Sequence, residues 1–286
     1  NRVEDAASLL TALVDQPDYA PFYAARATLP GRAAADARRD IERAAVLDTG
    51  EWRYGKMLAE HLLEAGDAKG AAAVARRYYA RLPANYILGL TLARTLVAAG
   101  EHREADALLG RLDVLPYEGA RDGHVLYREA KLMLATQAIG ARRWTESKRF
   151  IAAARDWPER LGAGKPYAAD ADEHLEDWLL ATALERSGQP GEATSLRTRL
   201  AGWAPSRATV GLEANIARAL SDEASASRAG VGRADSLRYG VGAWEPDSLG
   251  NHRAVVRVAV AADAVWAHIP WRRRDNAPDQ VNVVVV

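Results

Sequence analysis

A repeat with a period of about 34 residues is the feature that most limits the folds open to this chain. Residues 54–83 align with residues 88–117, and identical residues recur one period apart, as from 58 to 92. The matching pairs include Leu58 and Leu92, Ala59 and Ala93, Leu62 and Leu96, Gly66 and Gly100, and Ala71 and Ala105. In each unit apolar residues recur at helical spacing, a glycine breaks the run, and a second alanine-rich run ends at a proline. The pattern predicts a helix, a tight turn and a second helix in each unit.

The small residues in this pattern have a steric role. An alanine midway in the first helix and another early in the second allow antiparallel helices to approach within about 8 to 10 Å. With these residues, the sequence resembles the tetratricopeptide repeat (TPR) family, whose helix pairs stack into a right-handed superhelix. The resemblance implies a mainly α fold, a TPR-like α-solenoid of helical hairpins.

The resemblance covers about residues 1–205. Two units match closely, and further units are placed on residues 132–158 and 174–205, with degenerate ones before residue 52. The separation between Pro116 and Pro158 exceeds the repeat period, so eight extra residues are expected near 121–124. Residues 161–166 are expected to bulge out before the last unit. Residues 212–220 are expected to cap the stack, giving a helical repeat domain over residues 1–220.

Beyond residue 220 the composition changes. Residues 221–250 are rich in Ser, Ala and Gly, which favours a linker. Residues 251–286 alternate with period two and predict three short strands. The residues assigned to this segment as assembly strands are Val256, Val258, Val260, Trp266, Trp271, Arg272, Val281, Val283, Val284, Val285 and Val286.

Three strands in so short a segment cannot bury both faces of a sheet. The sheet therefore packs on the solenoid, continues beyond Val286, or receives strands from another chain by edge addition. Pairing between chains predicts a homo-oligomer, and a head-to-tail contact would grow into a filament unless its rotation closes a ring.

Composition excludes several functions. Lys plus Arg and Asp plus Glu both number 38, so the basic excess of a dedicated nucleic-acid binder is missing. The chain has no cysteine, which excludes disulfides and cysteine-based catalysis but leaves the compartment open. It has no apolar run as long as the roughly 18 residues of a transmembrane helix, so no membrane span is expected. It begins at Asn1 without a visible signal peptide, and we expect a processed or excised piece of a longer protein.

No motif predicts a catalytic, cofactor or metal site. The stretch Gly162–Pro166 lacks the spacing and the Ser or Thr of a phosphate loop. The acidic run from Asp170 to Asp177 opens a predicted helix, where carboxylates complement the helix dipole, and its spacing fits no calcium loop. Neither a nucleophile elbow nor a histidine pair at metal-binding spacing occurs. The chain is therefore expected to be non-enzymatic.

In superhelices of this kind the first helix of each pair lines the groove in which partners bind. This selects Arg53, Lys56, Glu60, Arg94, Arg128, Lys131 and Trp178 as groove candidates. Lysine and arginine there resemble groove sites that clamp a peptide carboxylate, but the family's asparagines are not at the matching positions. A solvated face of mixed charge is the alternative.

A second resemblance rests on residues 157–178 and 249–275, which include Trp178 and the run from Trp271 to Asp275. They are similar to repeat and β-sandwich segments of large bacterial proteins with glycoside-hydrolase-like domains. This implies an accessory, non-catalytic region without a catalytic barrel, at the cell surface or secreted, in which the aromatic and arginine run touches glycan. The alternative for this run is pairing of its arginines with nearby aspartates. The three functions to be distinguished are thus a self-assembling protein-interaction scaffold, a glycan-contacting accessory region and a peptide-binding adaptor.

Overall fold

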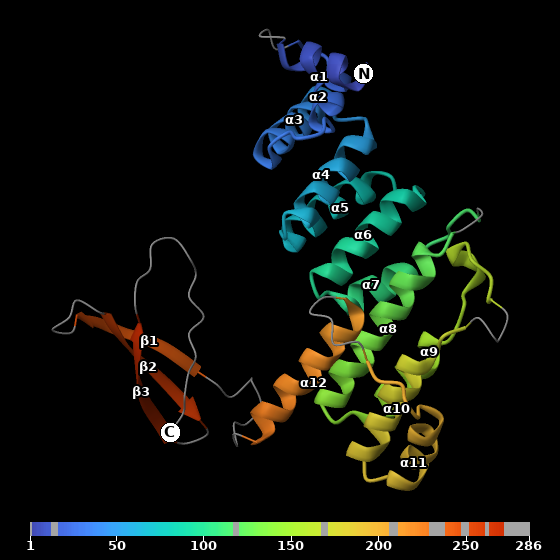
Figure 1. Ribbon diagram of the computed structural model, residues 1–286, viewed down its shortest axis with the longest axis vertical. Helices are drawn as coiled ribbons and strands as arrows, with labels where there is room; N and C mark the ends of the chain where they lie inside the picture. Colours follow the sequence, from blue (N-terminus) through green and yellow to red (C-terminus); the bar gives the residue numbers. More distant parts are fainter. Residues whose placement is uncertain are drawn as a thin grey trace. The chain divides into compact units, whose positions relative to one another are not determined.

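The computed structural model describes residues 2–12, 17–116, 120–166, 171–205, 211–228, 238–246, 252–260 and 263–271 (Figure 1). The chain divides into two compact units, residues 1–216 and residues 217–286. Each unit is described by itself.

In its described residues, the first unit consists of α1 (Arg2–Ala12) followed by five helical hairpins (Figure 1). The hairpins are α2 (Ala20–Ala27) with α3 (Ala34–Leu47), α4 (Trp52–Glu64) with α5 (Ala68–Arg81), α6 (Tyr86–Ala98) with α7 (His102–Leu109), α8 (Asp122–Gly140) with α9 (Trp144–Ala154), and α10 (His174–Arg186) with α11 (Pro190–Arg199). A 3-10 helix, η1 (Glu159–Leu161), lies between α9 and α10, and α12 (Leu212–Arg228) follows α11.

The hairpins stack in two layers. In each hairpin the two helices pack together, and the second helix packs against the first helix of the next hairpin. Successive first helices also touch: α4 with α6, α6 with α8, and α8 with α10. The first helices therefore form one layer and the second helices the other. This confirms the helix, turn, helix units predicted over residues 54–83 and 88–117.

The turns of four hairpins share one backbone conformation. Gly66, Gly100 and Gly188 have φ values of 81°, 78° and 79°, and Arg142 takes the same left-handed conformation at φ 56°. In each turn the next residue donates its N–H to the carbonyl five residues back, as Asp67 does to Leu62 at 2.8 Å and Arg143 to Ala138 at 2.8 Å. This is the Schellman motif, which satisfies the last free carbonyls of a helix. The glycine breaks in the sequence are thus helix stops, with Arg142 as a strained substitute.

Three glycines inside first helices, Gly55, Gly89 and Gly123, also recur one period apart, a signal that the sequence analysis missed. Each is covered by a side chain or backbone group from later in the chain. A methyl group at Gly55 would overlap the ring of Tyr78, one at Gly89 would overlap Leu112, and one at Gly123 would lie 2.8 Å from the carbonyl oxygen of Leu161. These glycines permit the close approach on which the stack depends.

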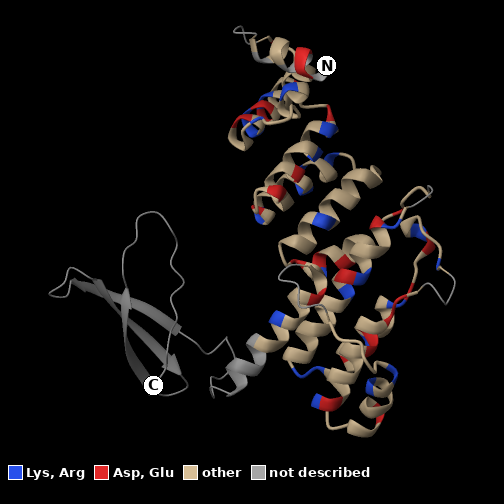
Figure 2. Cartoon of the chain, viewed as in Figure 1, with Lys and Arg blue, Asp and Glu red and all other residues tan. Residues whose placement is uncertain are grey.

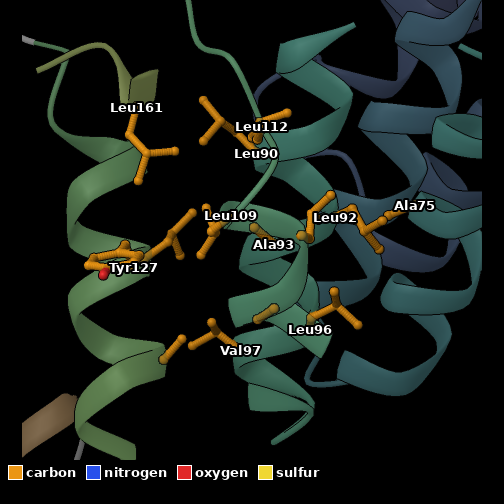
Figure 3. Close-up of a cluster of buried hydrophobic side chains, with 14 of the residues drawn as sticks. Ala75, Leu90, Leu92, Ala93, Leu96, Val97, Leu109, Leu112, Tyr127 and Leu161 are labelled. Atoms are coloured by element: carbon orange, nitrogen blue, oxygen red, sulfur yellow. The ribbon is translucent and has the colours of Figure 1, made fainter. Parts of the chain in front are cut away.

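One buried cluster spans the hairpins from α4 to α8. Leu92 and Leu96 of α6, Leu109 of α7, Tyr127 of α8 and Ala75 of α5 belong to one buried cluster (Figure 3). The predicted close-packing alanines, Ala59, Ala71, Ala93 and Ala105, are each 0% exposed. Full burial of these small residues confirms their steric role.

The fourth hairpin, α8 with α9, departs from the predicted register. The separation between Gly123 and Arg142 is eight positions longer than the separation between their counterparts, Gly89 and Gly100. The eight extra residues therefore lie inside α8 and not before it. With 19 residues against 13 in α4 and in α6, α8 is longer than these helices by roughly 9 Å.

The segment after α9 folds back onto the stack. The Val114 N–H donates to the Arg160 carbonyl at 2.7 Å, and Leu161 is 1% exposed within the core cluster. Gly162, at φ 84°, ends η1 beside Val114. Gly162, the first glycine of the Gly162–Pro166 stretch, therefore has a structural role in a turn.

The second unit contains strands β1 (Arg238–Pro246), β2 (His252–Val260) and β3 (Asp263–Trp271) in the antiparallel order β1-β2-β3. His252 lies opposite Trp271 and Val258 opposite Val265, and the β1–β2 register shifts between Val241 and Trp244.

The stretch expected to be a linker, residues 221–250, holds the end of α12 and all of β1. Tyr239 and Val241 alternate with Gly240 and Gly242, so a two-residue period was present, and the glycines concealed it. Residues 281–286, expected to form a strand, lie outside the described residues.

Candidate interaction surface

The seven groove candidates all lie on first helices. Arg53, Lys56 and Glu60 are on α4, Arg94 on α6, Arg128 and Lys131 on α8, and Trp178 on α10. Both acidic and basic residues occur on α4, α8 and α10, whereas α6 carries Arg94 alone (Figure 2). Their placement on first helices agrees with the sequence pattern, but the side chains differ in what they contact.

One group forms a chain of ion pairs across three helices. Lys56 Nζ lies 2.7 Å from a Glu60 carboxylate oxygen, and the other Glu60 oxygen lies 4.0 Å from Arg94. Arg94 in turn lies 3.0 Å from Asp122 at the start of α8. Arg53 pairs with Glu51 at 3.0 Å, before α4. The positive charge on this part of the layer is already neutralised by carboxylates of the same chain.

Lys131 points between two helices. Its Nζ lies 2.7 Å from the Asp106 carboxylate on α7 and 5.1 Å from the centre of the Tyr127 ring. With the lysine side chain 15% exposed, this contact stabilises the α7–α8 interface more than it presents charge to a ligand.

Arg128, which is partly buried, joins α8 to α10 through an ion pair with a buried carboxylate. Its Nε and a terminal nitrogen donate to the two Glu176 oxygens at 2.5 and 2.7 Å, and Glu176 is 1% exposed. Burial lowers the pKa of Arg128, but the hydrogen bond and charge of Glu176 outweigh it, so the pKa lies above the ordinary arginine value. The guanidinium therefore stays charged and ties the two hairpins together.

A small pocket of about 190 Å³ lies beside this pair. In its wall the His124 ring stacks on Trp157, with centres 3.4 Å apart and planes 9° from parallel. Burial, and next the nearby Arg128 charge, lower the pKa of His124 to about 4, so the ring is neutral near pH 7. His124 Nε2 is buried without a hydrogen-bond partner. No sequence motif had indicated His124, because its partner Trp157 lies in the segment after α9.

Trp178, the last groove candidate, is half-buried, and the Arg197 guanidinium of α11 lies 5.8 Å from its ring centre. It therefore packs within its own hairpin.

The acidic run that opens α10 is divided among separate contacts. Asp172 caps the helix by accepting from the His174 N–H at 3.1 Å, Glu176 binds Arg128, and Asp177 accepts from Arg155 at 2.6 Å. Within the described ranges no group of three His, Asp or Glu side chains is arranged to hold a metal ion. In the same part of the chain, no helix combines the length and the apolar character needed to cross a bilayer.

The backbones of Val256, Val258 and Val260 lie in β2, and those of Trp266 and Trp271 lie in β3. Arg272, Val281 and Val283–Val286 lie outside the described residues, so their predicted role in assembly stays a prediction.

Comparison with known proteins gives two family matches. Residues 62–114 match a tetratricopeptide repeat model, and residues 242–286 match the model of the glycoside hydrolase 123 N-terminal domain. The second match includes much of the sequence that resembles the β-sandwich segments of glycoside-hydrolase-like proteins. No curated protein matches the chain.

Solved structures similar to the chain include PilW, a widely conserved type IV pilus biogenesis factor, at 16% identity and a TM-score of 0.41, covering 76% of this chain and 92% of that one. Yeast Tom70 is 14% identical with a TM-score of 0.37, covering 80% of this chain and 47% of its own. TTC0263, a thermophilic TPR protein in Thermus thermophilus, is 16% identical with a TM-score of 0.32, covering 76% and 98%. The residues that match the tetratricopeptide repeat model lie within the stack of helical hairpins, and the helical unit has the fold of a TPR-like α-solenoid.

Proposed function

We propose that the helical unit is a non-enzymatic scaffold that binds other protein chains. The observation that carries this proposal is the stack of tetratricopeptide hairpins, because stacked repeats present an extended surface to a partner. The first-helix layer is the proposed contact surface. The charged groups of a partner there would replace ion pairs within the chain, such as the pair between Lys56 and Glu60.

The test uses the full chain as bait and measures captured proteins by quantitative mass spectrometry. Lys56→Glu with Arg94→Glu reverses two charges on the first helices α4 and α6, while Lys69→Glu with Lys148→Glu makes the same change in net charge on the second helices α5 and α9. A stoichiometric partner should be lost from the first variant and kept by the second. A wild-type chain that captures no protein saturably would contradict the scaffold function, and equal capture by both variants would contradict only the assignment of the surface.

Self-association through the C-terminal strands is the second part of this proposal. Among the described strands, β2 pairs on both edges, whereas β1 and β3 each pair on one. A free strand edge accepts a strand from another chain. Deletion of residues 280–286 should lower the mass of the oligomer or filament measured by light scattering, and an unchanged mass would count against strand exchange.

An alternative function is an accessory, non-catalytic region of a bacterial carbohydrate-active protein that contacts glycan. The match of residues 242–286 to the glycoside hydrolase 123 N-terminal domain favours it. Trp271, the last residue of β3, is the proposed stacking residue. Glycan-array binding that disappears in Trp271→Ala and persists in Trp266→Ala would support this function. A wild-type chain that binds no glycan would contradict it and leave the scaffold function as the one proposal.

A further inference from the structure

A second groove lies on the other layer of the stack, between the second helices α3 and α5. It has a volume of about 570 Å³, within the range of about 300 to 1,000 Å³ that is usual for binding pockets. Residues 38, 42, 45 and 46 of α3 form one wall, and residues 74, 77, 78 and 81 of α5 form the other. Both sets have helical spacing, so each helix presents one continuous face to the groove.

The interior of this groove is apolar. Leu58 and Leu62 of α4 form the floor together with Ala45 and Val74. Val46, on the wall, is 67% exposed, and Leu82, in an adjoining hollow that shares Tyr78 and Arg81, is 41% exposed. Exposed apolar side chains gathered at a hollow indicate a contact surface.

The charge at the rim is positive and is not neutralised. Arg38 pairs with Glu42 at 2.9 Å, which removes the one acidic residue of the lining. Within the described residues, Arg77 and Arg81 form no ion pair. The Arg77 guanidinium lies 5.3 Å from the centre of the Tyr78 ring, and Arg81 donates to the Thr49 carbonyl at 2.7 Å. The groove candidates Lys56, Arg94 and Arg128 of the first-helix layer are instead paired with carboxylates.

The equivalent gap between the next two second helices is bridged by ion pairs. Arg76 of α5 donates to Glu104 of α7 at 2.9 and 2.8 Å and also pairs with Glu101. Between α3 and α5 no ion pair of the described residues crosses the groove. The space is therefore open to a ligand that brings carboxylates of its own.

We propose that this groove binds an acidic, amphipathic segment of a partner protein. Apolar side chains of the segment would fill the floor over Leu58 and Leu62, and carboxylates beside them would pair with Arg77 and Arg81. The proposal rests on the scaffold function and adds to it a particular surface and the chemistry of the partner.

The experiment measures fluorescence anisotropy of a labelled peptide, about four helical turns long, in which leucine recurs at helical spacing and glutamate fills the other positions. A second peptide carries lysine in place of glutamate, and a third carries serine in place of leucine. The full chain is compared with Arg77→Glu plus Arg81→Glu. Arg111→Glu plus Arg149→Glu, at exposed positions outside the groove, makes the same change in net charge.

The acidic peptide should bind the wild type and the control variant, and should bind the groove variant at least about tenfold more weakly. The lysine peptide should show the reverse preference, and the serine peptide should not bind. Val46→Asp, which places a negative charge at an exposed position of the groove wall, should weaken binding of the acidic peptide while leaving both arginines in place.

Three results would overturn the proposal: no saturable binding of the acidic peptide, equal binding by wild type and groove variant, or an equal loss in the control variant. If captured proteins are lost from Lys56→Glu plus Arg94→Glu but are unaffected by Arg77→Glu plus Arg81→Glu, the scaffold function stands and this groove does not serve it.

Discussion

Replacing Gly123 by alanine tests whether the stack depends on close approach at the glycines inside the first helices. The added methyl group would lie 2.8 Å from the Leu161 carbonyl oxygen and 3.1 Å from Leu161 Cβ. A relaxed contact between carbon and a carbonyl oxygen is about 3.3 to 3.6 Å. Alanine at this position therefore requires a shift either of the Leu161 backbone or of the start of α8.

Two opposing effects set the magnitude. Alanine is favoured over glycine inside a helix by about 1 kcal/mol. Overpacking by one methyl group costs about 1 to 3 kcal/mol, and the upper part of this range applies because the clash is with backbone. Leu161 has little room to move, since it is 1% exposed and the preceding carbonyl accepts from Val114 at 2.7 Å. The net loss of unfolding free energy should be about 1 to 2 kcal/mol.

Gly191→Ala is the matched control. Gly191 lies in the first turn of α11, and a methyl group there would meet nothing within 4 Å. This variant should be neutral or more stable by up to about 1 kcal/mol. Urea unfolding followed by far-UV circular dichroism compares the variants, and hydrogen exchange should localise the Gly123→Ala effect to α8 and η1. If Gly123→Ala were as stable as Gly191→Ala, helix propensity would outweigh packing and the close-approach argument would be refuted.

The remaining predictions concern a turn, an ion pair and a histidine. Arg142→Gly should stabilise the chain by about 0.5 to 1 kcal/mol in urea unfolding, since it removes left-handed strain at φ 56°; a destabilised variant would mean that the Arg142 side chain matters more. Glu176→Gln should cost about 1 to 3 kcal/mol by leaving the partly buried Arg128 without its counter-ion, and Arg128→Met with Glu176→Leu should recover most of that; an equal loss in the double variant would refute the charge argument. His124 has a pKa near 4 when folded and 6.5 when unfolded, so the unfolded chain binds the proton more readily. Stability should be complete above about pH 6.5 and fall toward pH 4 by on the order of 3 kcal/mol, a slope that His124→Phe should flatten in thermal melts taken across that range.

The repeats could be predicted from sequence because their cause is local. Leu58 and Leu62 indicate a helix, Gly66 indicates its end one turn later, and the same pattern recurs one period further along the chain. Gly123 was missed because the eight extra residues were placed before the helix, which moved the third unit of the sequence alignment out of register.

The contacts of the charged residues could not be predicted in the same way. Helical spacing places Arg128 on a first helix, but its partner Glu176 lies 48 residues away, across an irregular segment that obeys no period. The groove between α3 and α5 likewise depends on how two second helices diverge. No pattern within either helix encodes that separation. Arg77 and Arg81 can be recognised as candidate contacts only once the structure shows that no carboxylate of the described residues pairs with them.

The added length of α8 has a consequence for how the stack comes apart. Eight residues advance a helix by about 2.2 turns. The side chains that follow the extra residues in α8 therefore point about 80° away from the direction they would have in a first helix without those residues. Leu126, Tyr127 and Ala130 are buried toward its beginning, and the run from Leu132 to Thr136 is buried toward its end. A single helix thus offers differently oriented apolar sides to the hairpins before it and after it. Removing it would leave both neighbours with bare apolar surface, and the hairpins flanking α8 should therefore melt together as one block, whereas α2 and α3 at the edge can fray alone.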